Sequence, residues 1–505
     1  MKQQNTKAQF SFGFLLCLIL TPLFLNAQSL TVVDNESLKP VPYASVEIYE
    51  VQVQSYCDEN GVYEFGYLSN TTPVIVSANG YKPTSFIYKA GDNNSYNIKL
   101  KKSHIFLNEI VVSPTTGLVQ KNNLTNVILK KINQADQIMA PNLMELITNV
   151  PGVYSINTGS SISKPVIRGL SGLKIVTFWN GLRIENQQWA NDHGLNFTDM
   201  GIKSVEIVKG PSSLLYGADA LGGVLYFTDE DYLPPNSFNS SFESRFESNS
   251  MSSFNIARIK LATEKVRFNV YAGYKSAAEY QIPDGEFVKN SSYNRKSLKA
   301  SLGYNKNNWI LNLRYNYNSN ENGLPGHTHS LNPSPEEFLL ETQNRDRILP
   351  LQLIEDHYLS IENKLILSNQ SVIKFNTGFT SNSITEFEEK VTIPGISMLL
   401  NNIPYNFSFT SHVNENIKWI SGIQGMLTKN SNDESAESSL IPNASSYDIG
   451  SYSLLQYSKS QFETQLGLRY DIREIDAGDL LSKNFSKLNG SFGLVFQKEL
   501  YTLRT

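Results

Sequence analysis

The chain contains little cysteine, little histidine and little charge. Among its 505 residues there are two Cys and six His, and the charged residues make up only 18%. Cys17 falls in an N-terminal apolar run, which leaves Cys57 without a second cysteine, so no internal disulfide is expected. The formal net charge of -4 offers no electrostatic attraction to a polyanion, so we expect no nucleic-acid partner.

The motifs of the common enzyme classes are also missing. The sequence shows no Ser-His-Asp arrangement, no His-Glu-x-x-His and no Gly-Lys-[Ser/Thr] phosphate loop. Glycines do cluster at Gly217, Gly222 and Gly223, but their spacing is not that of a dinucleotide-binding fingerprint. We therefore expect no enzymatic activity and no required cofactor.

Aromatic and small polar residues are what the chain has in quantity. It contains 26 Tyr and 26 Phe within an apolar fraction of 40%, and Asn and Ser fill much of the remainder. Such a composition suits long strands that have one apolar and one polar face. It predicts a mainly β protein and, at this length, more than one domain.

The N-terminus has the pattern of an export signal. Lys2 and Lys7 precede an apolar run over residues 10–25, and the small residue Ala27 follows it. The run is too short to make a good membrane-spanning helix, which is the alternative interpretation. We predict a signal peptide over residues 1–27, and hence a protein exported from the cytoplasm.

The next segment, over residues 28–102, alternates short strands with turns. Its pattern "VVDNESLKPVPYASVEIYE", followed by "DENGVYEFGYL", resembles the carboxypeptidase-regulatory-like domain, an immunoglobulin-like β-sandwich. No catalytic arrangement accompanies the resemblance. It implies a small, non-catalytic module in the periplasm.

Four stretches in the middle of the chain carry the most specific motifs. "NVPGV", "IRG", "NGLRI" and "VEIVKGPSSLLYGADALGGV" stand in the order and spacing of the plug of TonB-dependent outer-membrane receptors. The resemblance implies an α/β plug domain over residues 117–232. Its motif residues here are Arg168, Gly169, Lys209, Gly210, Pro211, Tyr216, Gly217, Gly222 and Gly223.

A short extended segment precedes the plug, in a linker over residues 105–116. It comprises Glu109, Ile110, Val111, Val112 and Ser113, and the proline that follows biases it to an extended backbone. On composition alone it would be an ordinary linker strand. Beside the plug it resembles the TonB box, which implies strand addition to the TonB-type energy-transducing protein of the inner membrane.

Residues 238–505 alternate apolar and polar side chains, as transmembrane strands of about ten residues do. Aromatic residues at strand ends favour a transmembrane antiparallel β-barrel, in contact with outer-membrane lipid, over a soluble sandwich with the same period. We count about twelve strands, and a further one beginning at Tyr501, against roughly 22 in plugged transporters. The expectation is an incomplete barrel.

Connection lengths give a second indication of a barrel, because short periplasmic turns alternate with long outer loops in such proteins. Short turns are predicted near residues 264–265, 306–308, 368–370, 413–415 and 458–461. Longer connections are predicted near residues 278–292, 320–356, 383–404, 429–446 and 472–487.

Two histidine-bearing stretches indicate a metal as the transported ligand. His327 and His329 stand one residue apart on a long connection, and Asp192 adjoins His193 in the plug. Imidazole and carboxylate suit zinc, copper and nickel. Both stretches resemble zinc-uptake receptors, which implies that these four residues bind the metal. The alternative is that both pairs are simply solvated, and His357 is expected to be a barrel-interior residue.

Two other functions remain open. A siderophore or cobalamin receptor would bind a bulky ligand, and Arg183 and Trp189 are candidate contacts for it. A surface adhesin or signalling receptor would bind without importing, although a signalling receptor is expected to carry a different periplasmic extension. In each case we expect an outer-membrane protein of a Gram-negative cell that binds a small extracellular ligand, with the sandwich and the TonB box in the periplasm.

Overall fold

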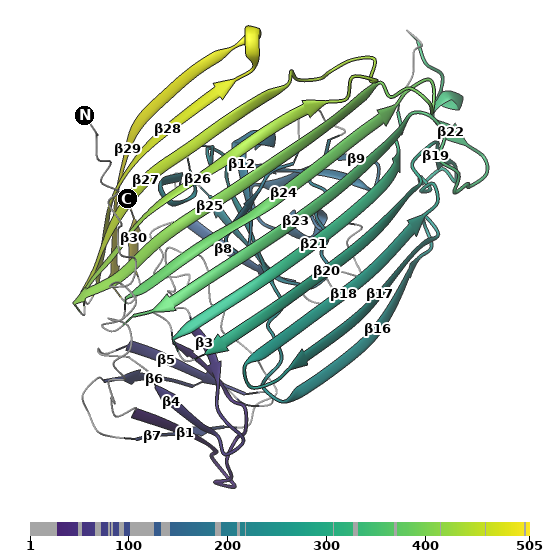
Figure 1. The fold of residues 1–505 in the computed structure, drawn as a ribbon. Coiled ribbons are helices and arrows are strands. Elements are labelled where there is room, and N and C mark those ends of the chain that lie inside the picture. The colour runs from purple at the N-terminus through teal and green to yellow at the C-terminus, as the bar shows by residue number, and fades with distance from the viewer. Residues whose placement is uncertain are drawn as a thin grey trace, which may run out of the picture.

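The computed structural model of the protein has three parts: a small sandwich, a plug and a large curved sheet (Figure 1). It describes residues 28–48, 53–65, 72–78, 81, 84–89, 95–101, 126–132, 142–186, 193–209, 213–217, 219–306, 308–326, 332–367, 371–414, 416–459, 461–498 and 501–504. The predicted signal peptide and the predicted TonB box lie outside the described residues.

The sandwich consists of two facing sheets, as predicted. Its strands are β1 (Gln28–Asp34), β2 (Ser45–Ile48), β3 (Val53–Tyr56), β4 (Val62–Phe65), β5 (Thr72–Ser77), β6 (Thr84–Tyr88) and β7 (Tyr96–Leu100). One sheet has the order β4-β1-β7 and the other β3-β2-β5-β6. Phe65 lies in the core between them, 4.6 Å from the ring of Tyr88 and 5.1 Å from that of Tyr63. Rings in such tilted and edge contacts add to the apolar burial that holds a small sandwich together.

The plug is built on a five-stranded sheet of order β13-β12-β15-β14-β8 and a three-stranded sheet of order β11-β10-β9. The elements are β8 (Asn126–Lys131), η2 (Glu145–Ile147), β9 (Val153–Thr158), β10 (Ile162–Ile167), β11 (Leu170–Ser171), η3 (Gly172–Lys174), β12 (Ile175–Trp179), β13 (Leu182–Ile184), β14 (Ile202–Lys209), α2 (Ser213–Tyr216) and β15 (Gly223–Asp229). The helices of this α/β unit are single turns. In the described part of the chain, no helix has the length and apolar character needed to cross a membrane.

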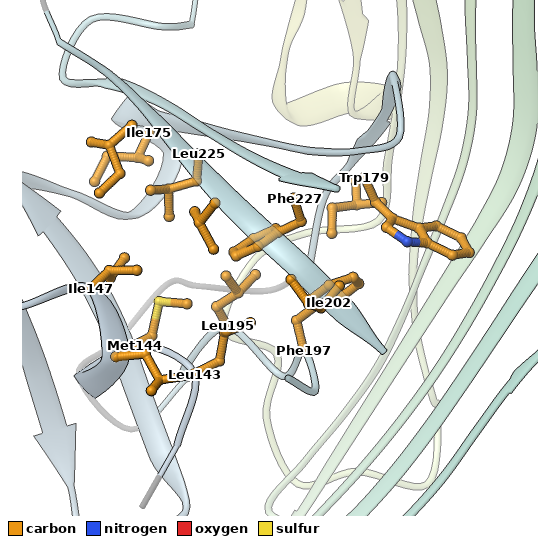
Figure 2. Close-up of a cluster of buried hydrophobic side chains, with 14 of the residues drawn as sticks. Leu143, Met144, Ile147, Ile175, Trp179, Leu195, Phe197, Ile202, Leu225 and Phe227 are labelled. Carbon is orange, nitrogen blue, oxygen red and sulfur yellow. The ribbon is translucent and has the colours of Figure 1, made fainter. Parts of the chain in front are cut away.

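Strand β12 is buried on both faces, because each face packs against its own apolar cluster. Trp179 and Ile175 point into one cluster with Phe227, which Figure 2 shows, while Phe178 points into the other. A strand covered on both sides needs apolar residues at every position and not at alternate ones. This explains why "IVTFW" is apolar at every position except Thr177, and it fixes the centre of the plug.

The large sheet has 13 antiparallel strands in sequence order and curves around the plug (Figure 1). They are β16 (Ser237–Glu247), β17 (Ser252–Ala262), β18 (Val266–Ala277), β20 (Tyr293–Lys306), β21 (Trp309–Gly323), β23 (Leu351–Ile366), β24 (Val372–Phe387), β25 (Ile396–Asn414), β26 (Ile417–Asn432), β27 (Ala444–Lys459), β28 (Phe462–Asp476), β29 (Ser482–Lys498) and β30 (Tyr501–Arg504). Outside it lie the short pair β19 (Phe287–Val288) and β22 (Leu339–Leu340), and the turns η4 (Pro335–Glu337) and η5 (Gly478–Leu480). The predicted twelve strands, and the further one from Tyr501, are confirmed.

In this sheet the apolar side chains lie on the exposed outer face and polar side chains lie on the inner face, which is the reverse of a soluble sandwich. On the outer face of β28, Leu466 and Leu468 are 54% and 55% exposed, whereas Arg469, on the inner face, is buried. Apolar side chains that stay exposed on a whole sheet face are typical of a surface that meets lipid. The barrel-type alternation that the sequence predicted is therefore present.

Two of the predicted long connections are much shorter than expected. The connection expected over residues 383–404 spans only 388–395, and the one expected over residues 472–487 spans only 477–481. The strands simply continue, and β25 reaches 19 residues. Polar residues at these strand ends resemble loops in the sequence. Backbone pairing nevertheless continues beyond the apolar band, where apolar and polar residues need no longer alternate.

The sandwich is fixed to one end of the large sheet. The Tyr56 hydroxyl donates to the carbonyl oxygen of Tyr232 at 3.2 Å, and the Arg267 guanidinium lies 5.2 Å above the Tyr56 ring. Ile366 and Val372, on either side of the short turn between β23 and β24, belong to the same apolar cluster as the sandwich core. The sandwich thus marks the end of the sheet that bears the short turns.

Candidate functional site

His193 is held in the seam between plug and sheet. It is 1% exposed, and its Nε2 lies 3.0 Å from Oε1 of Glu386, near the end of β24 that lies away from the sandwich. The Gln352 side chain donates to the same carboxylate oxygen at 2.7 Å. Among the described residues, Nδ1 of His193 has no hydrogen-bond partner. A buried imidazole and a buried carboxylate therefore face each other, and Nδ1 of the imidazole forms no hydrogen bond with the described residues.

This pair has the chemistry of two metal ligands. Zinc lies about 2.0–2.1 Å from nitrogen and oxygen ligands, which places two tetrahedral ligands about 3.3 Å apart. The 3.0 Å between His193 and Glu386 is close to that separation. Across the described residues, no group of three or more His, Cys, Asp and Glu side chains comes together. The other predicted ligands, Asp192, His327 and His329, lie outside the described residues.

A second site joins the plug to the sheet by charge. Asp219 accepts a hydrogen bond from Arg183 of the plug at 2.7 Å and another from Arg473 of β28 at 2.7 Å. Arg473 also bonds Asp448 of β27 at 2.7 Å, and Arg183 bonds Glu185. The plug and the sheet therefore share one carboxylate, and we call these five residues the Asp219 cluster.

The electrostatic interactions within the Asp219 cluster favour the ionised form of the Asp219 carboxylate. Burial by itself would raise the pKa of Asp219, but the charge of Arg183 and the hydrogen bond from Arg473 outweigh it and hold that pKa below its usual range. Arg183, the candidate substrate contact, has its charge engaged by two carboxylates of the plug. Its contact with a ligand stays a prediction, and Trp189, the second candidate, lies outside the described residues.

A cavity of about 490 Å³ adjoins the Asp219 cluster. Its lining mixes apolar side chains of the sheet with both arginines of the cluster, and includes Phe178, Leu182, Arg183, Tyr405, Met426, Ile449, Arg469, Ile472, Arg473 and Phe485. The volume is that of a small-molecule site. A bulky ligand, as considered from the sequence, has room here.

The glycines of the plug motif serve the fold of the plug itself. A Cβ at Gly223 would lie 2.6 Å from the carbonyl oxygen of Val208, and its φ of +146° suits glycine alone. A Cβ at Gly222 would lie 2.9 Å from the Leu170 side chain. Gly217, with φ +102°, ends α2. These glycines let strands approach each other and reverse direction.

The other motif residues act in the same way. Arg168 and Gly169 form the turn between β10 and β11 with φ of +52° and +79°, and the Lys209 ammonium donates to the Pro151 carbonyl. The Tyr216 ring packs 5.4 Å from Phe178 in the plug core. Gly210 and Pro211 lie outside the described residues. The motif therefore secures the plug fold.

Comparison with known proteins agrees with this architecture. Residues 122–224 match the TonB-dependent Receptor Plug Domain, and residues 31–112 match the CarboxypepD_reg-like domain. The plug and the sheet are those of a TonB-dependent receptor. The resemblances to the plug of TonB-dependent receptors and to the carboxypeptidase-regulatory-like domain are thereby confirmed, and the resemblance to zinc-uptake receptors stays a prediction.

Relatives of this receptor are named as transporters and receptors. It is 27% identical over 121 residues to "Vitamin B12 transporter BtuB" of Photobacterium profundum, a match covering 23% of this chain and 20% of that one. It is 29% identical over 154 residues to "Hemin receptor" of Yersinia enterocolitica, covering 29% and 21%. Those names support the expectation of a non-enzymatic role. The match spans only about a fifth of the length of each relative.

Solved structures with the same fold are matched over about three-fifths of their own length. The FrpB iron transporter from Neisseria meningitidis superposes with a TM-score of 0.62 at 14% identity, over 74% of this chain and 61% of that one. "Copper transporter OprC" superposes with a TM-score of 0.57 at 13% identity, over 73% and 60%. At these identities the likeness shows the fold.

Sequence reasoning missed Glu386 and Asp219. Alternate residues of β24 point inward, among them the buried Thr380, Asn382 and Ile384, so the same period of two could have placed Glu386 beside the plug. Asp219 is the one carboxylate within "YGADALGG", a segment otherwise made of small, aromatic and apolar residues. His357, expected in the barrel interior, lies instead on the outer face, because the inward residues of β23 are the even-numbered ones.

Proposed function

We propose that this receptor is an outer-membrane transporter that takes up a metal ion or a metal complex, with energy supplied by a TonB-type protein of the inner membrane. The observation that supports it is the buried His193–Glu386 contact, 3.0 Å long, at the end of the plug seam away from the sandwich. An imidazole and a carboxylate held out of water bind zinc, copper or nickel well. Asp192, adjoining in sequence, is the proposed third ligand, and His327 and His329 would complete the set.

A siderophore or cobalamin receptor is the second candidate, and the cavity beside the Asp219 cluster favours it. Its 490 Å³ exceed what a single ion needs, and its apolar lining suits an organic ligand. A receptor that binds without importing has less support, because the plug motif is that of a family whose named relatives include transporters. The two import hypotheses differ in whether His193 is needed.

The test is uptake in a deletion strain complemented with single variants. Growth and uptake are measured separately with zinc, copper and a ferric chelate as the limiting nutrient. We expect His193→Ala and Glu386→Gln to lower uptake of one of the ions by tenfold or more, since each removes one ligand. His357→Ala is the matched control, because that imidazole lies 42% exposed on the outer face.

The outcomes separate the candidates. Loss of zinc or copper uptake in both variants, with His357→Ala unchanged, supports the metal site. If ion uptake is the same in every variant while the deletion strain fails only on the ferric chelate, the metal-site proposal is wrong and the chelate receptor takes its place.

A further inference from the structure

A second cavity, of about 80 Å³, lies between the plug and the inner face of the sheet. The plug contributes Tyr216 and Tyr226, and the sheet contributes Lys364, Lys374 and Lys418 from three different strands. Among the described residues that line it there is no Asp or Glu. The rest of its wall combines apolar side chains with polar neutral groups, the latter being Asn376, Asn406, Ser408, Thr410 and Gln424. We call this the lysine cavity.

The lysine cavity gathers positively charged side chains from neighbouring strands. Lys364 and Lys374 stand directly opposite each other in the register of β23 and β24, so both ammonium groups are on the same inner face. Like charges in this position are destabilising. Glu362 lies 3.0 Å from Lys374, but it also lies 2.9 Å from Arg314, so this carboxylate is shared between two cations.

The position of the cavity relates it to the direction of transport. Lys374 lies two residues beyond Val372, which packs with the sandwich core, whereas Glu386 lies at the other end of the same strand. Lys374 and Glu386 are twelve residues apart along β24. This corresponds to about 40 Å at the usual rise per residue of a strand. A ligand that moved past the plug from Glu386 towards the sandwich would reach the lysine cavity late in its passage.

The chemistry of the lining selects the class of ligand. Three ammonium groups, with amide and hydroxyl groups around them, are donors to oxyanions, and they would repel a bare dication. The cavity has room for a carboxylate or a phosphate group and for little more. Lys364 is more than nine-tenths buried, so water screens its interaction with a bound anion only weakly.

We propose that the lysine cavity binds an oxyanion, a carboxylate or phosphate group, borne by the ligand that passes the plug. The assignment of this oxyanion to an imported ligand rests on the proposed function, because only an importer brings a ligand to this cavity. Binding of an oxyanion by the purified protein does not depend on import. The proposal favours an anionic metal complex over a free ion as the species that leaves the plug.

Titration calorimetry of the full chain in detergent, in a buffer with chloride as its only other anion, tests the binding. Inorganic phosphate and citrate are the two probes, because they separate a phosphate from a carboxylate source. We expect saturable binding of one or both, weakened tenfold or more in Lys364→Gln/Lys418→Gln. Lys429→Gln is the matched control, since it removes the same charge from β26 at an exposed position and should change affinity less than twofold.

A measurement on the unaltered protein guards against variants that misfold. Acetylation by a lysine reagent, read by mass spectrometry, should be slowed at Lys364 and Lys418 by the binding probe and unchanged at Lys429. The proposal is overturned if neither probe binds saturably, if the double variant binds like the unaltered protein, or if the probe protects neither lysine. Failure of the uptake proposal would instead appear in the His193→Ala strain, with the titration unaffected.

Discussion

Replacing Asp219 with alanine is the most direct test of how the plug is held. The change removes the carboxylate that receives Arg183 from the plug and Arg473 from the sheet, each at 2.7 Å. Breaking a buried ion pair costs about 3–5 kcal/mol when a charge is left unpaired. Here Arg183 keeps Glu185 and Arg473 keeps Asp448, and the Arg473 side chain is 33% exposed, so screening lowers the effect. We expect a loss of about 2 kcal/mol in the free energy of unfolding.

The assay is equilibrium unfolding by guanidinium in detergent micelles, followed by tryptophan fluorescence. A double-mutant cycle of Asp219→Ala with Arg473→Met should give a coupling energy of about 1–2 kcal/mol. Asp479→Ala, an exposed aspartate of η5 with the same charge change, should alter the free energy by less than about 0.5 kcal/mol. A coupling energy near zero, with Asp219→Ala no worse than Asp479→Ala, would refute the reasoning.

The same cluster predicts a pH dependence. The folded protein holds the pKa of Asp219 below its unfolded value, so the stabilisation is present above about pH 4 and is lost as the pH falls through the depressed pKa. The Asp219→Ala variant should lose this part of the acid sensitivity, and a difference between the two proteins that stays constant down to pH 2 would contradict the assignment.

Three further predictions concern other parts of the chain. Val111→Pro should abolish uptake while ligand binding persists, because proline cannot donate to a paired strand; a variant that still imports contradicts the TonB-box prediction. Gly223→Ala should destabilise the plug by about 1–3 kcal/mol, measured by unfolding, and an unchanged midpoint would show that the β14–β15 approach tolerates a methyl group. Burial, with Asp58 nearby, raises the pKa of the Cys57 thiol to about 12, so a thiol reagent should label it only after the sandwich unfolds. Rapid labelling of the folded protein at neutral pH would disprove this.

The fold could be predicted from two features of the sequence, namely the period of its apolar residues and the plug motif. Alternation of apolar and polar residues with a period of two is a local property, so the large sheet could be predicted strand by strand. The plug could be predicted because its glycines are required by backbone geometry, as at Gly223, and therefore stand at fixed spacing. Strand ends were less predictable. Beyond the apolar band, the alternation of apolar and polar residues in the sequence stops while the backbone hydrogen bonds continue.

The sites were less accessible from the sequence because their members lie far apart along it. Glu386 is 193 residues from His193, and Asp219 is 254 residues from Arg473. Each becomes a partner only through the register of the sheet against the plug, which no local pattern encodes. The lysine cavity is a similar case, since Lys364 and Lys374 meet only because the turn between β23 and β24 sets them opposite each other.

The docking of the sandwich has a mechanical consequence. The sandwich ends and the plug begins on either side of residues 101–125, the stretch that contains the predicted TonB box. One end of that stretch leads to a module tied to the wall through Tyr56 and through the apolar contacts of Ile366 and Val372. The other end leads to β8, an edge strand of the plug sheet. A pull on the stretch therefore acts against an anchored module on one side and peels an edge strand on the other, and peeling breaks hydrogen bonds one after another and needs less force than shearing them together.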